Sequence, residues 1–267
     1  MFTKLSPGQG IFLGTGTSHG VPMIGCTCAV CQSDDPRNRR TRSSMILGCP
    51  EGNLLIDTSP DLREQFLREK LQTTHALLYT HAHADHLFGL DDTRLFSHYN
   101  HEQPLPVFCN REVEEAIRKG FAYIFDPEVQ QYPAGGIPKL QFHTLEPNVP
   151  VEILGQNVLP LKLLHGKNPI LGFRIGNFAY CTDVKTVPQE SVEQLFGLET
   201  LILGCLRYRP HVTHMNLEEA LAFIQIIRPR RVFFTHICHD FDHEKLSSEL
   251  PDNIRPAYDG LRLENGW

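Results

Sequence analysis

The sequence lacks the long hydrophobic runs that mark membrane proteins. Its 267 residues contain no uninterrupted apolar stretch of about 18 residues or more, so no membrane span is expected. Residues 1–10 also lack a basic stretch followed by an apolar one, the pattern of a secretory signal. These absences argue against a membrane-embedded or exported protein, and we expect a cytoplasmic location.

The sequence also has no excess of positive charge. It has 25 Lys and Arg against 31 Asp and Glu, which gives a formal net charge of -6. A broad nucleic-acid surface needs clustered basic residues, so this balance argues against one and leaves room only for a local basic patch. The 41% hydrophobic and 21% charged composition is that of an ordinary globular chain. We expect one domain, covering residues 1–267.

Histidine and cysteine are the abundant residue types, with 14 His and 8 Cys. A chain of this length without an export signal does not need disulfides for stability. Five cysteines are scattered and predicted to be small buried side chains: Cys49, Cys109, Cys181, Cys205 and Cys238. The remaining three form a cluster and require a separate explanation.

Short apolar segments alternate with amphipathic ones without a strict strand–helix rhythm. Strands are predicted at residues 43–47, 53–57, 74–80, 158–164, 172–175, 178–182, 201–206 and 232–235. Helices are predicted at residues 62–70, 112–125 and 216–227. This order indicates an α/β protein with mixed sheets and helices outside them.

Four potential metal ligands follow the strand predicted at residues 74–80. They are His81, His83, Asp85 and His86, in the pattern His-x-His-x-Asp-His. In an extended or tightly looped segment, the first two imidazoles can approach one point while the last two side chains face another. Imidazole nitrogens and a carboxylate suit a divalent metal such as zinc or manganese. The motif therefore predicts a metal site with catalytic ligands.

This motif resembles the signature of the metallo-β-lactamase-fold hydrolases. Four further residues resemble the family's remaining motif positions in the same chain order: Asp57, His165, Asp183 and His236. The resemblance covers residues 11–239. It implies a four-layer αββα fold, in which two β-sheets pack between outer helices.

The resemblance also implies how the ligands divide between two divalent ions, which would be Zn, Mn or Ni. His81, His83 and His165 would bind the first ion, Asp85, His86 and His236 the second, and Asp183 would bridge them. Asp57 is expected to orient a ligand rather than to bind metal itself.

A second candidate site lies in an N-terminal loop at about residues 25–31. Cys26, Cys28 and Cys31 are spaced so that three thiolates can converge on one ion, and tetrahedral zinc requires a fourth ligand. His239 and Cys238 are both candidates for it. The arrangement resembles one branch of the superfamily, the phosphoribosyl 1,2-cyclic phosphate phosphodiesterases, in which such a cluster with a late histidine holds a structural zinc. That resemblance favours His239.

His214 is the candidate proton donor. It lies just before the predicted helix start at Asn216 and resembles a histidine that faces the phosphate in the phosphodiesterases. A histidine with a near-neutral pKa is suited to protonate a leaving alkoxide. His211 is the rival residue, and a capping role for His214 is the structural alternative. Asp85 is the second candidate catalytic residue.

The resemblance implies a dinuclear metal-dependent phosphodiesterase that uses a metal-bridging hydroxide. The expected substrate is a small phosphodiester, in particular a cyclic sugar phosphate. Binding to nucleic acid or to a membrane is not expected, and the protein could form a homodimer. The first alternative is a ribonuclease Z-like tRNA 3′-processing nuclease, although a basic Gly/Pro-rich arm is absent from the sequence. The others are a thioester or lactone hydrolase on the same fold and a non-catalytic metal protein.

Overall fold

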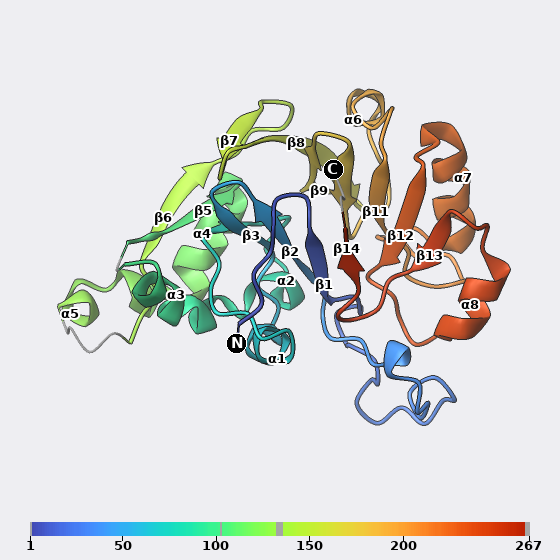
Figure 1. The fold of residues 1–267 in the computed structure, drawn as a ribbon, viewed down its shortest axis with the longest axis horizontal. Helices are drawn as coiled ribbons and strands as arrows, with labels where there is room; N and C mark the ends of the chain where they lie inside the picture. Colours follow the sequence, from blue (N-terminus) through green and yellow to red (C-terminus); the bar gives the residue numbers. More distant parts are fainter. Residues whose placement is uncertain (1, 102, 132–135, 265–267) are drawn as a thin grey trace.

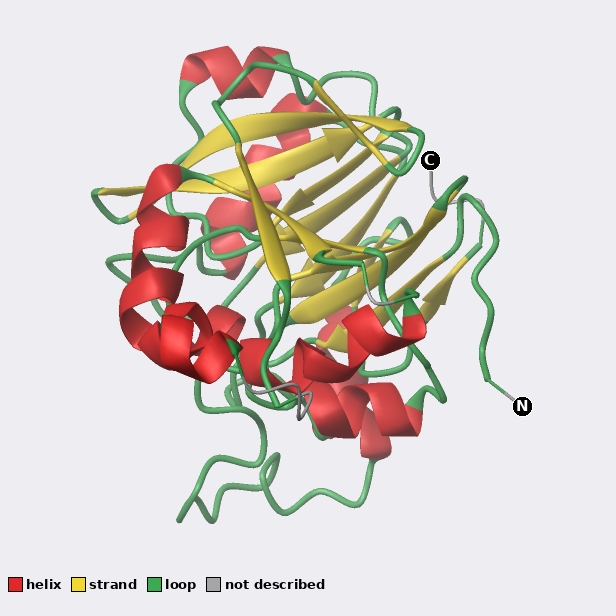
Figure 2. Cartoon of the chain, turned by 90° about the vertical axis from the view of Figure 1, so that its left-hand side faces the viewer, coloured by secondary structure: helices red, strands yellow, loops and turns green. Residues whose placement is uncertain are grey.

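Two seven-stranded β-sheets face each other and carry helices on their outer sides (Figures 1 and 2). The computed structural model describes residues 2–101, 103–131 and 136–264. The predicted four-layer αββα architecture is confirmed. Among the described residues, no helix has the length and apolar character needed to cross a membrane.

The first sheet has the strand order β14-β1-β2-β3-β4-β5-β6. Its strands are β1 (Gly10–Gly14), β2 (Ser44–Cys49), β3 (Gly52–Ile56), β4 (Ala76–Leu78), β5 (Leu105–Cys109), β6 (Leu140–Thr144) and β14 (Arg262–Leu263). β3 and β4 run parallel, so the residues that follow them lie at the same edge of the sheet. This topology brings Asp57 and His81 together.

The second sheet has the order β13-β12-β11-β10-β9-β8-β7. Its strands are β7 (Val151–Ile153), β8 (Gln156–His165), β9 (Asn168–Ile175), β10 (Phe178–Cys181), β11 (Thr200–Gly204), β12 (Arg231–Thr235) and β13 (Ile254–Pro256). β10, β11 and β12 are parallel neighbours. Their carboxyl ends therefore share an edge, where Asp183 and His236 follow β10 and β12.

Side-chain alternation along the strands builds three apolar layers. In β11, Ile202 packs between the two sheets, whereas Leu201 and Leu203 pack beneath the outer helices. The helices outside the first sheet are α1 (Leu62–Arg68), α3 (Arg94–Tyr99) and α4 (Arg111–Gly120), and those outside the second are α7 (Leu217–Ile227) and α8 (His243–Glu249). Because both faces of each sheet are covered, the strands read as nearly continuous apolar runs.

The shorter helical segments complete the order of elements. They are α2 (Ala84–Leu87), α5 (Pro127–Gln130) and α6 (Gln189–Glu193), with 3-10 turns η1 (Pro36–Asn38), η2 (Leu90–Thr93) and η3 (Ala122–Phe125). α2 carries Asp85 and His86. The long connection between β1 and β2 extends away from the sheets (Figure 1).

Several predicted boundaries were wrong at their ends. The helix predicted at residues 112–125 stops at Gly120 and is followed by η3. The strand predicted at residues 74–80 is only β4, because Thr80 leaves the sheet and donates its backbone N–H to Asp57 Oδ1 at 2.9 Å. The strand predicted at residues 201–206 is shifted to Thr200–Gly204.

Candidate metal centres

Three residues of the candidate metal site follow strands and adopt the left-handed backbone conformation. Asp57 after β3 has φ 60°, Asp183 after β10 has φ 54°, and His236 after β12 has φ 55°. Residues other than glycine rarely adopt positive φ, and such strain concentrates at functional sites. All three side chains are buried. Strained turns at strand ends thus position three polar side chains at one edge of the sandwich.

Asp85, His86, Asp183 and His236 offer donor atoms that all lie within 4.8 Å of one another. His86 Nε2 is 3.2 Å from Asp183 Oδ1 and 3.3 Å from Asp85 Oδ2. His236 Nε2 is 3.2 Å from Asp183 Oδ2 and 3.4 Å from Asp85 Oδ2. The structure therefore brings together the residues predicted for the second ion and the predicted bridging carboxylate.

Asp57 fixes this group from behind. Its carboxylate accepts hydrogen bonds from Thr80 N–H, from Thr80 Oγ1 at 2.8 Å and from His86 Nδ1 at 2.7 Å. With Nδ1 held in this way, His86 directs Nε2 toward Asp85 and Asp183. This is the contact expected of a residue that orients a metal ligand.

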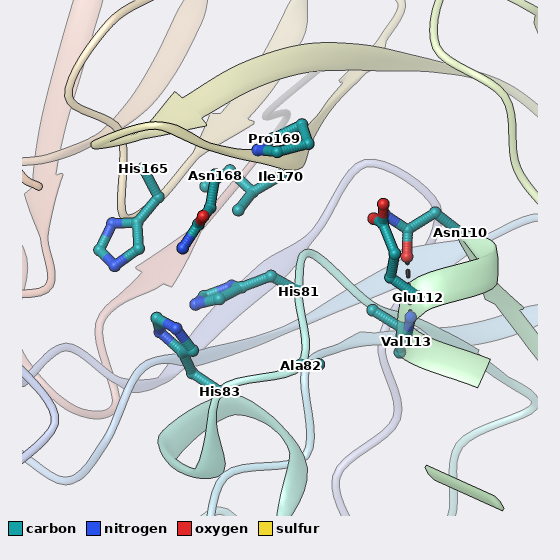
Figure 3. Close-up of a pocket in the computed structure, with 10 residues that line it drawn as sticks. All are labelled: His81, Ala82, His83, Asn110, Glu112, Val113, His165, Asn168, Pro169 and Ile170. Atoms are coloured by element: carbon teal, nitrogen blue, oxygen red, sulfur yellow. Dashed lines mark hydrogen bonds between the residues drawn. The ribbon is translucent and has the colours of Figure 1, made fainter. Parts of the chain in front are cut away.

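His81, His83 and His165 converge at the neighbouring position (Figure 3). The ring centroid of His83 lies 4.5 Å from that of His81 and 5.0 Å from that of His165. His165 donates from Nδ1 to the backbone carbonyl of Asp183 at 2.7 Å, which leaves its Nε2 as the free nitrogen. His81 Nε2 is 4.0 Å from Asp183 Oδ2. Asp183 thus contacts ligands predicted for both ions.

His214 lies inside the donor cluster. Its Nδ1 is 3.8 Å from Asp183 Oδ2, and it forms a further compact donor group with His165 and Asp183. The sequence predicts a proton donor here, and the geometry also makes His214 a potential ligand. It does not cap α7, because Asn216 and Glu219 form that capping box. The ring of His211 lies 5.1 Å from that of His214, and both residues are partly exposed.

Burial and mutual charge shift the pKa values of these groups in opposite directions. Burial opposes the charged form of His86, but Asp183 and Asp57 raise its pKa well above the usual value. Burial alone would raise the pKa of Asp183, yet His236 and His86 hold it well below its usual range. Burial, with a contribution from nearby His236, lowers the pKa of His214 to about 3. This shift runs against the near-neutral pKa that suits a free-standing proton donor.

The donor set fits divalent cations. Both His81 Nε2 and His86 Nε2 are buried and face the carboxylate of Asp183, and neither has a hydrogen-bond partner among the residues that the structure describes. Buried polar atoms in proteins are nearly always satisfied, so orphaned imidazole nitrogens beside carboxylates mark a place for an ion. Imidazole and carboxylate donors accept zinc, manganese or nickel.

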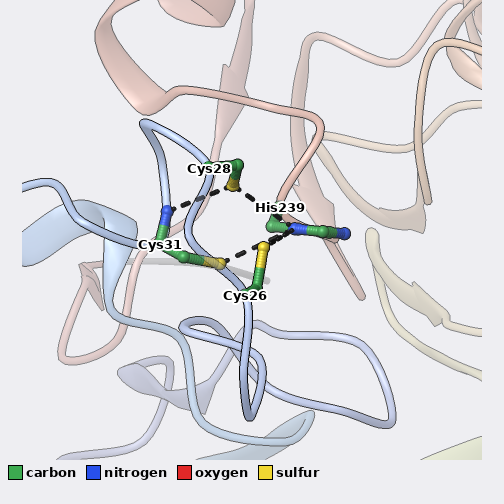
Figure 4. A group of neighbouring side chains, drawn as sticks. All are labelled: Cys26, Cys28, Cys31 and His239. Atoms are coloured by element: carbon green, nitrogen blue, oxygen red, sulfur yellow. Dashed lines mark hydrogen bonds between the residues drawn. The ribbon is translucent and has the colours of Figure 1, made fainter.

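The cysteine loop forms a separate donor group (Figure 4). His239 Nδ1 lies 3.2 Å from Cys26 Sγ, 3.4 Å from Cys28 Sγ and 3.6 Å from Cys31 Sγ. A hydrogen bond from the Cys31 backbone and the nearby His239 ring lower the pKa of Cys28 to about 6, which favours the thiolate that metals bind. Three sulfurs and one nitrogen form a donor set typical of structural zinc.

Of the two candidates for the fourth position, the geometry favours His239. Cys238 is buried and its Sγ accepts from the backbone N–H of Asp240 at 3.3 Å, outside the donor group. The side chain three residues after His236 therefore faces the cysteine loop. One short segment carries a donor for each of the two centres.

Two charged residues that join distant parts of the chain near this segment escaped the sequence analysis. Arg40 donates from Nη1 to the Cys238 carbonyl at 3.3 Å and from Nη2 to the Phe241 carbonyl at 3.0 Å. Asp259 accepts from the backbone and side chain of both Thr15 and Thr41. Neither residue lies in a recognisable motif, because their partners are distant in the chain.

Two pockets border the cluster, each of about 250 Å³. The first is lined by His81, His83 and His165 together with Asn110, Glu112 and Asn168. The second lies beside His214, and its wall includes the N-terminal loop at Thr17–Gly20. The cluster is thus accessible to a small molecule from two sides.

A sandwich with these ligands at one edge has the architecture of a known superfamily of metal-dependent hydrolases. Residues 52–237 match the model of the Beta-lactamase superfamily domain. A crystal structure of a new diphosphatase from the PhnP family is 38% identical, covers 96% of both chains and superposes with a TM-score of 0.88. The chain therefore belongs to the metallo-β-lactamase-fold hydrolase superfamily and, within it, to the PhnP family.

Other relatives are more distant or differ in length. Zn²⁺-bound PqqB from Methylobacterium extorquens has a TM-score of 0.72 at 22% identity over 96% of this chain and 99% of its own, so it shares the fold. An octanoyltransferase of Porphyromonas gingivalis is 38% identical over 255 residues, 94% of this chain and 50% of that protein. The chain thus spans about half the length of this curated relative.

Proposed function

We propose that the protein is a dinuclear metal-dependent hydrolase of phosphoric esters or anhydrides in a small molecule, with a cyclic sugar phosphodiester as the favoured substrate. The observation that carries this proposal is the convergence of seven imidazole and carboxylate side chains around Asp183 at the open edge of the sandwich. The full-length similarity to a diphosphatase of the PhnP family supports phosphorus as the centre that is attacked.

Two ions would be held by the histidine and carboxylate cluster. His81, His83 and His165 would bind one, Asp85, His86 and His236 the other, and Asp183 both. A zinc ion would be held by Cys26, Cys28, Cys31 and His239. When bound, paired divalent ions supply Lewis-acid stabilisation of phosphate charge and a nucleophile at neutral pH.

The residues of the chain supply orientation. Asp57 fixes the ring of His86, and the carbonyl of Asp183 fixes that of His165, so both imidazoles keep one nitrogen directed at the cluster. Burial of Asp183 and His236 keeps bulk water away from the reacting centre and strengthens their electrostatic effect. The site is therefore ordered before a substrate arrives.

His214 would contact the phosphate of the substrate. With its pKa lowered to about 3, its imidazole is neutral at pH 7 and has one ring N–H to donate. A phosphate oxygen at that ring would favour the charged form and so shift the pKa upward on binding. We therefore assign His214 as a hydrogen-bond donor to phosphate, in place of a free-standing acid with a near-neutral pKa.

A small-molecule substrate is favoured over tRNA. The pockets beside the cluster have volumes of about 250 Å³ each, and the net charge of the chain is -6. All eight cysteines are free, which agrees with a reducing, cytoplasmic environment. The octanoyltransferase name belongs to a protein about twice as long and is not assigned to this chain.

The test is a substrate panel on protein stripped with a chelator and reloaded with Mn²⁺, Ni²⁺ or Zn²⁺. The panel contains bis(p-nitrophenyl) phosphate, a nucleoside 2′,3′-cyclic phosphate, a nucleotide diphosphate ester, an acyl thioester and a tRNA precursor. We expect hydrolysis of a small phosphate substrate, lost in the Asp183→Asn variant. Fully metal-loaded protein that cleaves only the thioester or only the tRNA precursor would contradict the proposal.

A further inference from the structure

The segment after β12, residues 236–241, carries one donor for each of the two candidate metal centres. His236 Nε2 lies 3.2 Å from Asp183 Oδ2 and 3.4 Å from Asp85 Oδ2. His239 Nδ1 lies within 3.6 Å of all three sulfurs of the cysteine loop (Figure 4). Since only two residues separate the two histidines, a displacement of this segment would move a donor at both centres.

The side chain of Arg40 holds this segment. Its Nη1 donates to the carbonyl of Cys238 at 3.3 Å and its Nη2 to the carbonyl of Phe241 at 3.0 Å. These two carbonyls lie on either side of His239 in the chain. The guanidinium therefore fixes the backbone around His239 through two hydrogen bonds that need no metal ion.

The backbone of Arg40 also closes the loop that carries the cysteines. Val21 N–H donates to the Arg40 carbonyl at 2.8 Å, and Arg40 N–H donates to the Val21 carbonyl at 2.7 Å. The three clustered cysteines lie between these two residues in the sequence. Arg40 thus joins the base of the cysteine loop, through its backbone, to the segment of His239, through its side chain.

The surroundings of Arg40 do not compensate its charge with an ion pair. The residue is 1% exposed, and its guanidinium has no carboxylate at ion-pair distance among the described residues. The side-chain oxygen of Asn38 accepts from Nη2 at 3.0 Å, and Nε has no partner among those residues. Burying such a charge costs free energy, and a hydrophobic side chain of similar volume is often at least as stabilising. The contacts of Arg40 therefore serve the position of the segment more than the stability of the fold.

We propose that Arg40 is a positioning residue for both metal centres, because it holds the 236–241 segment in place whether or not the cysteine loop carries zinc. A zinc ion bound through His239 would hold the same segment from its other side. Either contact alone would then keep His236 directed at Asp85 and Asp183. The inference rests on the two metal centres of the proposed function and not on the reaction.

A double-mutant cycle of Arg40→Met and Cys28→Ala tests this redundancy. Methionine keeps much of the volume of the side chain and removes its donors. The measured quantity is the dissociation constant of Mn²⁺ at the histidine and carboxylate cluster, obtained from the paramagnetic resonance of free Mn²⁺ with one equivalent of zinc present. Each single variant should change it by no more than about twofold, whereas the double variant should weaken binding by about 10- to 100-fold. A double variant no weaker than the product of the two single effects would overturn the proposal.

The zinc affinity of the cysteine loop gives a second readout, measured by competition with a chromogenic chelator. Arg40→Met should weaken zinc binding by about 10- to 100-fold, because the backbone around His239 is no longer held before the ion binds. Arg40→Lys should keep part of the affinity, since an ammonium can donate to one of the two carbonyls but lacks the planar fork. The lysine variant keeps the charge and carries the same cycle in case Arg40→Met does not fold. Wild-type zinc affinity in both variants would contradict the positioning role.

Arg42→Met is the matched control. Arg42 lies on the same connection between β1 and β2, but its side chain pairs with Asp61 at 2.9 Å instead of contacting the 236–241 segment. This variant should keep the wild-type zinc affinity, and its cycle with Cys28→Ala should be additive. Equal coupling in the Arg42 and Arg40 cycles would attribute the effect to general loosening of the connection and would overturn the proposal.

The metal measurements separate this inference from the proposed function. Coupling in the Arg40 cycle supports the positioning role even when none of the phosphate substrates is cleaved, in which case only the hydrolase function fails. Cleavage of a phosphate substrate by the wild type, with additive effects in the Arg40 cycle, rejects the positioning role and leaves the function standing.

Discussion

The two candidate metal centres of this protein are built in different ways. The histidine and carboxylate donors follow strands or lie on the short helix α2, and most of their side chains are buried. The cysteine donors are half-exposed in a loop, where local contacts such as Cys31 N–H to Cys28 Sγ at 3.4 Å hold them. The sandwich therefore positions the first set, whereas contacts within the loop hold the second, and an ion bound there would stabilise the loop further.

This difference predicts independent failure of the two centres. Asp183→Asn removes a carboxylate that contacts both halves of the histidine cluster, and the fold around it is held by two seven-stranded sheets. We expect kcat/KM to fall by about 10³-fold, in line with the loss of a central charge from a reacting centre. Elemental analysis should show fewer catalytic ions and one retained zinc.

The control for Asp183→Asn is its thermal unfolding. A folded variant with a Tm close to that of the wild type assigns the loss to the site. If the variant also lost the zinc bound by the cysteines, the two centres would form one cooperative unit. That result would contradict the prediction that they fail independently.

The reverse experiment is Cys28→Ala. Removing one thiolate should release one zinc equivalent, leave the catalytic ions bound and lower the Tm by about 5–10 °C, which corresponds to about 2–3 kcal/mol. Cys238→Ala is the matched control because Cys238 adjoins His239 in sequence but lies outside the donor group. Retention of zinc by Cys28→Ala, or its loss from Cys238→Ala, would reverse the assignment.

The proximity of the histidine and carboxylate side chains could be predicted from the sequence because motif order reflects strand order, whereas their role as ligands stays a prediction. His81 to His86 follow β4 of the first sheet, and Asp183 and His236 follow two parallel strands of the second sheet. Parallel pairing aligns the strand ends within each sheet, and the face-to-face packing of the two sheets brings the two groups together. The outer layers were equally predictable from apolar runs and amphipathic segments. Boundaries failed where a polar contact, such as that of Thr80 with Asp57, draws the chain out of the sheet.

Features that depend on tertiary contacts were not predictable. Choosing between His239 and Cys238 requires the direction of each side chain after β12, which residue spacing does not give. The low pKa of His214 arises from burial and from His236, which is distant in sequence. Arg40 and Asp259 gave no signal, because an isolated charged residue usually lies at the surface.

A smaller effect is expected from Asp57→Asn, which tests how far the scaffold orients the ligands. The amide keeps the size of the side chain but removes the charge that faces His86 Nδ1. Loss of such an orienting partner should weaken metal binding at the Asp85 and His86 side by about 10- to 100-fold, with the cysteine-bound zinc unchanged. Competition with a chelator of known affinity measures the change.

Asp61→Asn is the matched control, since Asp61 pairs with Arg42 at 2.9 Å outside the cluster. Unchanged metal affinity in Asp57→Asn would mean that packing alone orients His86. Equal weakening in both variants would attribute the effect to loss of charge in the region rather than to the contact with His86.

The smallest effect is expected at the contact between the loop before β2 and the start of α8. His243 at the start of α8 is buried, and its backbone N–H donates to Asn38 Oδ1 at 2.9 Å, beside Arg40. Burial, together with Arg37 and Arg40, lowers the pKa of His243 to about 4, against the opposing influence of Asp35 and Glu244. Below its unfolded pKa of about 6.5, the unfolded chain binds a proton that the folded chain does not.

The stability contributed by a neutral His243 is therefore complete above about pH 6.5 and is lost as the pH falls toward 4. When the pH falls from 7 to 5, the free energy of unfolding in urea should decrease by about 1–2 kcal/mol less for His243→Gln than for the wild type. This difference does not depend on the stability of the variant at pH 7. His101→Gln, at an exposed position, should keep the wild-type pH dependence. Equal acid sensitivity of His243→Gln and the wild type would show that His243 does not cause the loss of stability, and that acid acts on other groups.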